Sequence, residues 1–389
     1  MRIAMFTDTY LPTRDGVVTS ILTTKQRLEE LGHEVFMFAP EPESDADKEK
    51  GVYYFRAVSF DKYPGYRVAM FPTNKCEILE DLDVDVIHTH GLLAMALRSM
   101  FAGRVLRKPV VVSFHTMVTE ASKYYVRMAL PDPILNRLFW IYLRQLLERA
   151  DAVVVPSEAI KTELSQYAPD MKKIEVIPTG VDCSLFSPEV DGTMVRRRHG
   201  LDKEKVILNV GRIAWEKNLD LILKGFSVLK SRDDDVRLMI VGEGPAKDHC
   251  MRLAAELGIA DKTTFTGFVP DAELPQYYAA SDAFVMASKF ETQGIVVLEA
   301  MASGKPVAGI NFRAVAEIIR NGENGFLFDE NPESCASAME VALNCTDEVR
   351  NAARRRAKEY SMSDGAGRLV KVYEFAIERK RAFLDGRIK

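Results

Sequence analysis

Short runs rich in Val and Ile alternate with longer amphipathic stretches almost from end to end of this chain, and this alternation restricts its possible folds most. A short apolar run of this kind is typical of a strand buried on both faces of a parallel sheet. The runs of the first half are Arg2 to Phe6, Glu34 to Phe38, Val84 to His88, Val110 to Phe114 and Ala152 to Val155. Amphipathic stretches between them, such as Thr19 to Leu31 and Leu92 to Leu106, indicate helices.

The pattern then starts again in the second half. The further strand candidates are Val206 to Val210, Val236 to Val241, Thr263 to Thr266, Ala283 to Met286, Val307 to Ile310 and Gly325 to Phe328. Two successive sets of strand–helix units predict an α/β protein with two doubly wound, Rossmann-like domains. Turn residues at Pro178 to Asp182 follow a further strand candidate, Ile174 to Ile177, and predict the boundary. We therefore expect domains over residues 1–182 and 183–364, followed by a long amphipathic helix within 365–389.

Composition excludes several classes of protein. The net charge of -4 over 389 residues gives no reason to expect nucleic-acid binding. No apolar run approaches the roughly 20 residues that span a bilayer, and the apolar start at Met1 to Phe6 reads as a strand and not as a signal peptide. The five cysteines show no CxxC spacing, which favours free thiols in a reducing, cytoplasmic setting.

Ligands of doubly wound domains bind at the carboxyl ends of the strands, so the segments after each strand are the candidate sites. The loop Thr7 to Gly16 ends in a glycine before a helix, whose backbone N–H groups can hold an anion; a plain turn is the alternative. The only near match to GxGxxG, Gly242-Glu243-Gly244, lacks the third glycine, so a nicotinamide fingerprint is not supported.

Three histidines end two neighbouring strand candidates. His115 directly follows Val110 to Phe114, where its ring can donate a hydrogen bond to a bound sugar. His88 and His90 end the preceding strand candidate, but no third ligand accompanies them, so we expect no metal site. Taken singly, each histidine is more often a hydrogen-bonded structural residue than a ligand.

Two segments of the second half carry charges suited to a nucleotide sugar. Arg212 and Lys217 follow the first strand candidate, where two cations can face a diphosphate; a solvated basic loop is the alternative. Glu291 and Glu299 flank Gly294, which we expect to open a helix with its free N–H groups toward a phosphate. Carboxylates suit vicinal sugar hydroxyls because each accepts several hydrogen bonds.

Together these residues resemble the retaining glycosyltransferases of family 4, which have the GT-B fold of two Rossmann-like domains facing across a cleft. Glu291 to Glu299 is similar to the E-x7-E motif of that family. The other matching positions, in the family's order along essentially the whole chain, are the Gly16 loop, His115, Pro178 to Asp182, Arg212 and Lys217. The resemblance also implies that the final helix packs back on the first domain.

The resemblance implies a role for each matching residue. Arg212 and Lys217 bind the donor diphosphate, Glu299 binds the ribose, and Glu291 holds the transferred sugar. The full implied donor site is Gly16, Arg212, Lys217, Val269, Glu291, Gln293, Gly294, Ile295 and Glu299. The implied catalytic residues are His115, Arg212, Lys217 and Glu291. No metal or other cofactor is expected, since the two cations neutralise the departing diphosphate. Asp15 departs from the family, which carries glycine or asparagine there, and its role stays open.

The acceptor side is basic and aromatic. Between Arg98 and Arg149 there are nine Lys or Arg residues against three acids. Interleaved aromatic residues suggest contact with anionic lipid, and the expected acceptor or membrane residues are Tyr124, Tyr125, Arg127 and Trp140. The alternative is that Phe139, Trp140 and Leu143 are core residues.

The sequence words Phe114 to Met117 and Glu291 to Gly294 resemble the diacylglycerol and glycolipid glucosyltransferases. We therefore expect transfer of glucose from UDP-glucose to a lipid by a peripheral enzyme on the cytoplasmic membrane face. The alternatives are a GDP-mannose-dependent mannosyltransferase acting on a phosphoinositide-type lipid, related to the phosphatidylinositol mannosyltransferases, and a transferase with a soluble acceptor. A sugar epimerase would need a pair of acid–base groups, and we identify no such group in this sequence besides His115. A catalytically silent sugar-binding protein would be expected to lose Arg212, Lys217 or Glu291, and all three are present.

Overall fold

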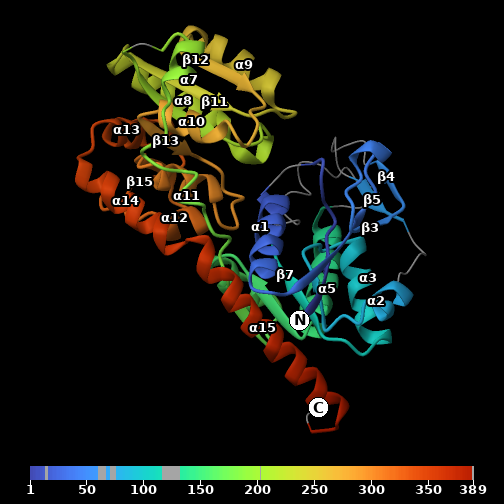
Figure 1. Cartoon of the computed structure of the whole chain (residues 1–389). Helices are drawn as coiled ribbons and strands as arrows, with labels where there is room; N and C mark the ends of the chain where they lie inside the picture. The colour runs from blue at the N-terminus through green and yellow to red at the C-terminus, as the bar shows by residue number, and fades with distance from the viewer. Residues whose placement is uncertain (14–15, 60–66, 71–75, 116–131, 202, 388–389) are drawn as a thin grey trace. The chain divides into compact units, whose positions relative to one another are not determined.

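The computed structural model describes residues 1–13, 16–59, 67–70, 76–115, 132–201 and 203–387 (Figure 1). The chain divides into two compact units. The N-terminal unit comprises residues 1–180 together with residues 362–389, and the C-terminal unit comprises residues 181–361. The division thus falls just before Val181, and the last segment belongs to the N-terminal unit.

The N-terminal unit is built on a seven-stranded sheet of order β3-β2-β1-β6-β7-β8-β9, whose neighbouring strands are all parallel. Its strands are β1 (Arg2–Phe6), β2 (Glu34–Pro40), β3 (Val52–Phe55), β6 (Val86–Thr89), β7 (Val110–Ser113), β8 (Ala152–Val155) and β9 (Ile174–Val176). The strand order reverses between β1 and β6, which is where a doubly wound sheet places its ligand. A short antiparallel pair, β4 (Ala57–Ser59) and β5 (Arg67–Ala69), stands apart from the sheet.

Helices cover both faces of this sheet. They are α1 (Gly16–Glu30), α2 (Cys76–Asp81), α3 (Ala94–Val105), α5 (Asp132–Arg149), α6 (Glu158–Tyr167) and α15 (Met362–Leu384). On one face, Leu369 and Tyr373 of α15 pack with Ile3, Val86 and Val111 of the strands. Figure 1 shows α15 running alongside this sheet, so the last helix of the chain completes the core of the first unit.

The C-terminal unit has a six-stranded sheet of order β12-β11-β10-β13-β14-β15, in which every neighbouring pair is parallel. Its strands are β10 (Lys205–Val210), β11 (Val236–Val241), β12 (Thr263–Gly267), β13 (Ala283–Met286), β14 (Val307–Ile310) and β15 (Phe326–Phe328). The order reverses between β10 and β13, so the loops after these two strands meet at the switch point.

The helices of the C-terminal unit enclose a single large apolar cluster that includes Leu208, Phe226, Ile240 and Phe284. They are α7 (Thr193–Arg198), α8 (Leu219–Arg232), α9 (Lys247–Glu256), α10 (Leu274–Ala280), α11 (Ile295–Ala302), α12 (Arg313–Ile318), α13 (Pro332–Leu343) and α14 (Asp347–Glu359). Two parallel α/β units with helices on their sheets confirm the prediction of a doubly wound α/β protein.

Strand ends differ from the sequence expectations by one or two residues. Strand β6 begins at Val86 and not at Val84, and helix α1 begins at Gly16, ahead of the expected Thr19. Strand β3 and the β4–β5 pair have no counterpart among the expected elements. Each of these three strands has only one buried residue, so none of them has to be a continuous run of Val and Ile like the buried central strands.

Candidate active site

A salt bridge joins the two loops at the switch point of the C-terminal unit. Lys217 ends the short 3-10 helix Trp215–Lys217 after β10, and Glu291 follows β13. Lys217 Nζ donates to Glu291 Oε1 at 2.6 Å. Asn218 strengthens the same junction, because its side-chain amide donates to the carbonyl of Ala287 at 3.4 Å. The fold therefore brings together two residues that are 74 positions apart in sequence.

Both members of this pair are held in their charged forms. Burial alone raises the pKa of Glu291, but the charge and hydrogen bond of Lys217, helped by a hydrogen bond from Ser288, outweigh it and leave the pKa lowered. For Lys217, burial lowers the pKa, and the charge and hydrogen bond of Glu291 reverse this so that the pKa is raised. Arg212 also acts on Lys217, since its charge lowers the Lys217 pKa. Arg212, Lys217 and Glu291 thus form one electrostatic group.

Helix α11 begins directly beside this group. Gly294 caps it with a φ of +89°, a left-handed conformation that glycine adopts without strain. The preceding residue, Gln293, is buried. The first backbone N–H groups of a helix have no partner within the helix and carry a partial positive charge. Gly294 thus lets the chain turn from the loop containing Glu291 into a helix start that suits an anion.

Glu299 lies on α11 and is buried. Its Oε2 accepts a hydrogen bond of 2.6 Å from the hydroxyl of Tyr278, a fully buried residue of α10. Burial raises the pKa of Glu299 to about 7; the Tyr278 hydrogen bond opposes this rise and the charge of Asp271 adds to it. Tyr278 is a site residue that sequence reasoning missed, because no local motif links it to α11.

The glycines near Gly242 serve loop packing. Gly242 has a φ of +139°, and a Cβ there would lie 2.0 Å from the carbonyl oxygen of Gly211. A Cβ on Gly244 would lie 2.2 Å from the carbonyl oxygen of Ile213. The loop after β11 therefore lies so close to the loop that carries Arg212 that a side chain at either glycine would collide with its backbone. The backbone of Gly242 also donates to the carbonyl of Gly267 at 3.0 Å, next to the buried Val269.

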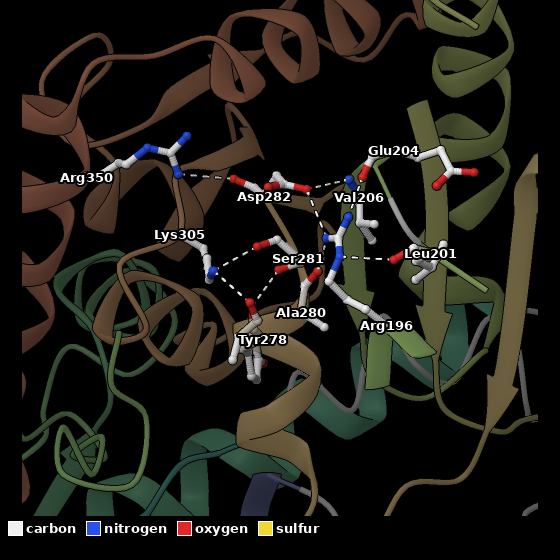
Figure 2. A network of polar contacts seen from close by, with 11 residues as sticks. Arg196, Leu201, Glu204, Val206, Tyr278, Ala280, Ser281, Asp282, Lys305 and Arg350 are labelled. Atoms are coloured by element: carbon white, nitrogen blue, oxygen red, sulfur yellow. Dashed lines mark hydrogen bonds and ion pairs between the residues drawn. The ribbon is translucent and has the colours of Figure 1, made fainter. Parts of the chain in front are cut away.

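A second group of cations, at the amino ends of the same strands, is structural (Figure 2). Lys305, from the Gly-Lys-Pro segment after α11, donates to the backbone carbonyls of Ala279 and Ser281. Arg196 donates to the carbonyls of Ala280, Leu201 and Glu204 and lies 3.5 Å from a carboxylate oxygen of Asp282. Lys305 therefore caps the end of α10 and lies at the amino ends of the strands, whereas Lys217 lies at their carboxyl ends.

In the N-terminal unit, the carboxyl ends of β6 and β7 hold the three histidines. His115 follows β7, and its Nε2 lies 3.0 Å from Nδ1 of His90. The two nitrogens of His88 are each 2.7 Å from a hydroxyl, Nδ1 from that of Tyr373 and Nε2 from that of Ser113. Both ring nitrogens of His88 are thus occupied by protein groups, which agrees with a structural role and not with metal ligation.

The remaining predicted residues of this unit have separate outcomes. Gly16 is the first residue of α1. Asp15, Tyr124, Tyr125 and Arg127 lie outside the described residues. Trp140 of α5 is half-buried, stacks on Tyr167 with 3.9 Å between ring centroids and packs against the core. Its packing agrees with the core alternative for this residue, and Leu143 is fully buried. No helix in the described chain is long and apolar enough to cross a membrane.

Comparison with known proteins agrees with the expected family. Residues 14–185 match the model of glycosyltransferase family 4, and residues 193–360 match that of glycosyl transferases group 1. The alpha-monoglucosyldiacylglycerol synthase of Streptococcus pneumoniae is 31% identical over 97% of this chain and 86% of that protein. A GDP-mannose-dependent alpha-mannosyltransferase of Mycolicibacterium smegmatis is 29% identical over 98% of this chain and 99% of that protein.

Solved structures share the fold. HepE of Anabaena in complex with UDP-glucose aligns with a TM-score of 0.73 at 18% identity, over 96% of this chain and 99% of HepE. Sucrose-phosphate synthase from Thermosynechococcus elongatus aligns with a TM-score of 0.75 at 20% identity, over 96% of this chain and 98% of that one. The family models and the pneumococcal relative together cover both units. The chain therefore belongs to glycosyltransferase family 4 and is a hexosyltransferase with the GT-B fold.

Proposed function

We propose that this enzyme transfers glucose from UDP-glucose to a membrane lipid or glycolipid, with retention of configuration at the anomeric carbon. The observation that carries the proposal is the charged Lys217–Glu291 pair beside the start of α11. The pneumococcal relative is named a monoglucosyldiacylglycerol synthase, which supports glucose and a diacylglycerol-type lipid as the substrates.

In the proposed donor complex, the diphosphate lies against Lys217, Arg212 and the first N–H groups of α11. Lys217 has three N–H donors, and within the described residues it donates one of them, to Glu291, which leaves two for phosphate oxygens. Glu291 binds hydroxyl groups of the hexose, and His115 donates to the same sugar. Glu299 accepts hydrogen bonds from the ribose, with Tyr278 fixing one of its oxygens.

The proposed chemistry is a front-face displacement. The bond between the anomeric carbon and the β-phosphate oxygen breaks while the acceptor oxygen bonds to the same face of that carbon. The proton of the acceptor hydroxyl passes to the departing phosphate. Lys217 and Arg212 stabilise the negative charge that grows on the diphosphate, a role that divalent ions fill in other transferases. We therefore propose a metal-independent reaction, for which activity in EDTA is the test.

We also propose that the enzyme docks on anionic membranes through helix α3. Leu93 caps this helix, and the exposed apolar residues there recur at every fourth position, on one helix face: Leu93, Leu97, Phe101 and Val105. Arg104 and Arg107 are exposed beside them, and no residue from Val86 to His115 is acidic. A helix face that combines apolar side chains with cations suits the interface of an anionic bilayer.

Leu138 and Ile141 of α5 extend this surface. Both are exposed, and α5 adjoins the start of α3 because the hydroxyl of Tyr142 donates to the carbonyl of Leu92 at 2.8 Å. We call the residues Leu93, Leu97, Phe101, Val105, Leu138 and Ile141 the apolar surface. A group of exposed apolar side chains of this kind marks a site of interaction with a protein or a membrane.

The test of the function is a matrix of donors and acceptors. Purified enzyme is given UDP-glucose, UDP-galactose or GDP-mannose with mixed vesicles that contain diacylglycerol, its monoglucoside or phosphatidylinositol. We expect a glucolipid from UDP-glucose alone, with an α-anomeric proton signal in the product. A mannolipid from GDP-mannose on phosphatidylinositol would replace the proposal with the mannosyltransferase alternative, whose donor is the one that the name of the mycobacterial relative gives. Glucose transfer to a soluble sugar in preference to every lipid would contradict the acceptor.

A further inference from the structure

The rings of two buried histidines of the N-terminal unit, His88 and His90, form a row with that of His115. His90 is 5% exposed and follows β6, while His115 follows the adjacent strand β7. The rings of His90 and His115 are nearly parallel, with an interplanar angle of 10° and Nδ1 of His90 at 3.0 Å from Nε2 of His115. On its other side His90 faces the ring of His88 at a centroid distance of 4.1 Å.

His88, at the inner end of this row, is held in place by its neighbours. It is fully buried, and both of its nitrogens are engaged by hydroxyls, that of Ser113 on the neighbouring strand and that of Tyr373 on α15. Tyr373 is itself fully buried. The ring of His88 therefore cannot rotate without breaking two hydrogen bonds, and His90 packs against an immobile surface.

Burial keeps both inner histidines neutral. It lowers the pKa of His88 to about 3 and the pKa of His90 well below its usual value, with the neighbouring histidines adding to both shifts. A neutral imidazole has one N–H donor and one acceptor nitrogen. The contact between His90 and His115 therefore requires a proton on one facing nitrogen and a lone pair on the other.

The remaining nitrogen of His90 decides which ring donates. Nε2 of His90 is buried and has no hydrogen-bond partner within the described part of the chain. If His115 donated, the proton of His90 would sit on Nε2 as an unpaired buried N–H group. Unpaired buried N–H groups are rarer in proteins than under-used acceptors. The favoured arrangement is therefore His90 Nδ1–H donating to Nε2 of His115, with the His115 proton on its Nδ1.

We infer that His90 is a positioning residue that holds the His115 ring in place and fixes its proton on Nδ1. His115 then presents a donor from a set nitrogen to the transferred hexose. This step rests on the proposed function, in which His115 contacts the sugar. His90 itself touches no substrate and acts only through His115.

The test uses the different reach of asparagine and glutamine. The side-chain amide nitrogen of asparagine occupies the place of a histidine Nδ1, whereas that of glutamine occupies the place of Nε2. His90→Asn thus keeps a donor toward His115, and His90→Gln removes it. The protonation of His115 is read by nitrogen NMR in protein labelled at histidine, without any donor or acceptor present.

We expect His115 to be protonated on Nδ1 in the wild type and in His90→Asn, and to be a mixture of both tautomers in His90→Gln. We expect kcat to fall roughly 10-fold in His90→Gln, which corresponds to the loss of about one hydrogen bond. The KM for UDP-glucose should change less, and His90→Asn should retain most of the activity. His115→Ala should be at least as impaired as His90→Gln.

The outcomes separate the inference from the function beneath it. Protonation of wild-type His115 on Nε2, or an unchanged tautomer in His90→Gln, would overturn the inference even if neither variant could be assayed. A His115→Ala enzyme with full activity would instead show that the proposed sugar contact is wrong. Equal losses in His90→Asn and His90→Gln would indicate that His90 only supports packing, which also contradicts the inference.

Discussion

Lys217 and Glu291 contact each other at 2.6 Å, although the proposed roles assign one to the diphosphate and the other to the sugar. The contact is compatible with both roles, since the pair keeps each side chain charged before a donor arrives. In the proposed reaction, a preformed pair also limits the reorganisation needed when charge develops on the leaving diphosphate.

Substitutions of this pair should separate stability from catalysis. Lys217→Ala leaves the half-buried Glu291 without its partner, so we expect a loss of about 2 kcal/mol in the free energy of unfolding. Adding Glu291→Gln should recover most of that stability, while transfer stays reduced by roughly 100-fold or more. Urea unfolding and a lipid glucosylation assay measure the two effects. Recovery of activity together with stability in the double variant would contradict the assignment of Lys217 to the diphosphate.

The stability of the protein should depend on pH through Glu299. Its pKa is about 7 in the folded protein against 4.5 in a model peptide, so the folded state binds the extra proton between these values. Stability from this group is therefore highest below pH 4.5 and falls as the pH rises toward 7. Glu299→Gln removes this titration. The free energy of unfolding of the variant, relative to that of the wild type, should therefore rise by on the order of 3 kcal/mol between pH 5 and pH 8.

Tyr278→Phe should strengthen the pH dependence that Glu299→Gln removes. It removes a hydrogen bond that lowers the Glu299 pKa, so the fall in stability should extend to higher pH than in wild type. Chemical unfolding at several pH values measures both variants. Parallel pH profiles for wild type and Glu299→Gln would contradict the burial effect on this group.

Gly294→Ala should weaken donor binding through the backbone. A residue with a Cβ is strained at a φ of +89°, by about 1 kcal/mol, and relief of the strain displaces the start of α11. Gly322→Ala is the matched control, since Gly322 has a φ of +80° and open space around its Cβ position. Both variants should lose similar stability in urea, but only Gly294→Ala should lose affinity for UDP in calorimetry. Equal affinities would place the phosphates away from α11.

Membrane docking should depend on the apolar surface. The double variant Leu97→Glu with Phe101→Glu introduces two charges where the side chains are 45% and 49% exposed, and it should abolish flotation with anionic vesicles at low salt. The control carries Met251→Glu and Val341→Glu in the C-terminal unit, at 47% and 48% exposure. We expect the control to float like the wild type. Unchanged flotation of the α3 variant would assign docking to another surface.

Much of the fold follows from sequence because the central strands of both sheets are buried on two faces and read as continuous apolar runs. The loops carrying Arg212, Lys217 and Glu291 were located for the same reason, since each follows such a run. Strand β3 was not expected, although Val52 to Phe55 is rich in aromatic residues, because it is an edge strand in which only Phe55 is buried.

Contacts between distant segments carry no local signal. Tyr278 and Glu299 meet because α10 and α11 pack on one sheet, and the sequence between them gives no sign of it. The contact of His90 with His115 depends on β6 and β7 being neighbours, which the strand order determines. Composition also does not distinguish packed from exposed aromatic residues: Trp140, in the basic and aromatic stretch, is half-buried and stacks on Tyr167.

We propose that the C-terminal unit holds a nucleotide sugar by its diphosphate at Lys217 and by its ribose at Glu299. Calorimetric titration of UDP, UMP and uridine into wild type, Lys217→Ala and Glu299→Gln tests it most directly. We expect Lys217→Ala to weaken the binding of UDP by roughly 10-fold or more and to leave the binding of uridine unchanged, whereas Glu299→Gln should weaken the binding of all three ligands. Equal weakening of UDP and uridine by Lys217→Ala, or unchanged uridine binding in Glu299→Gln, would contradict it.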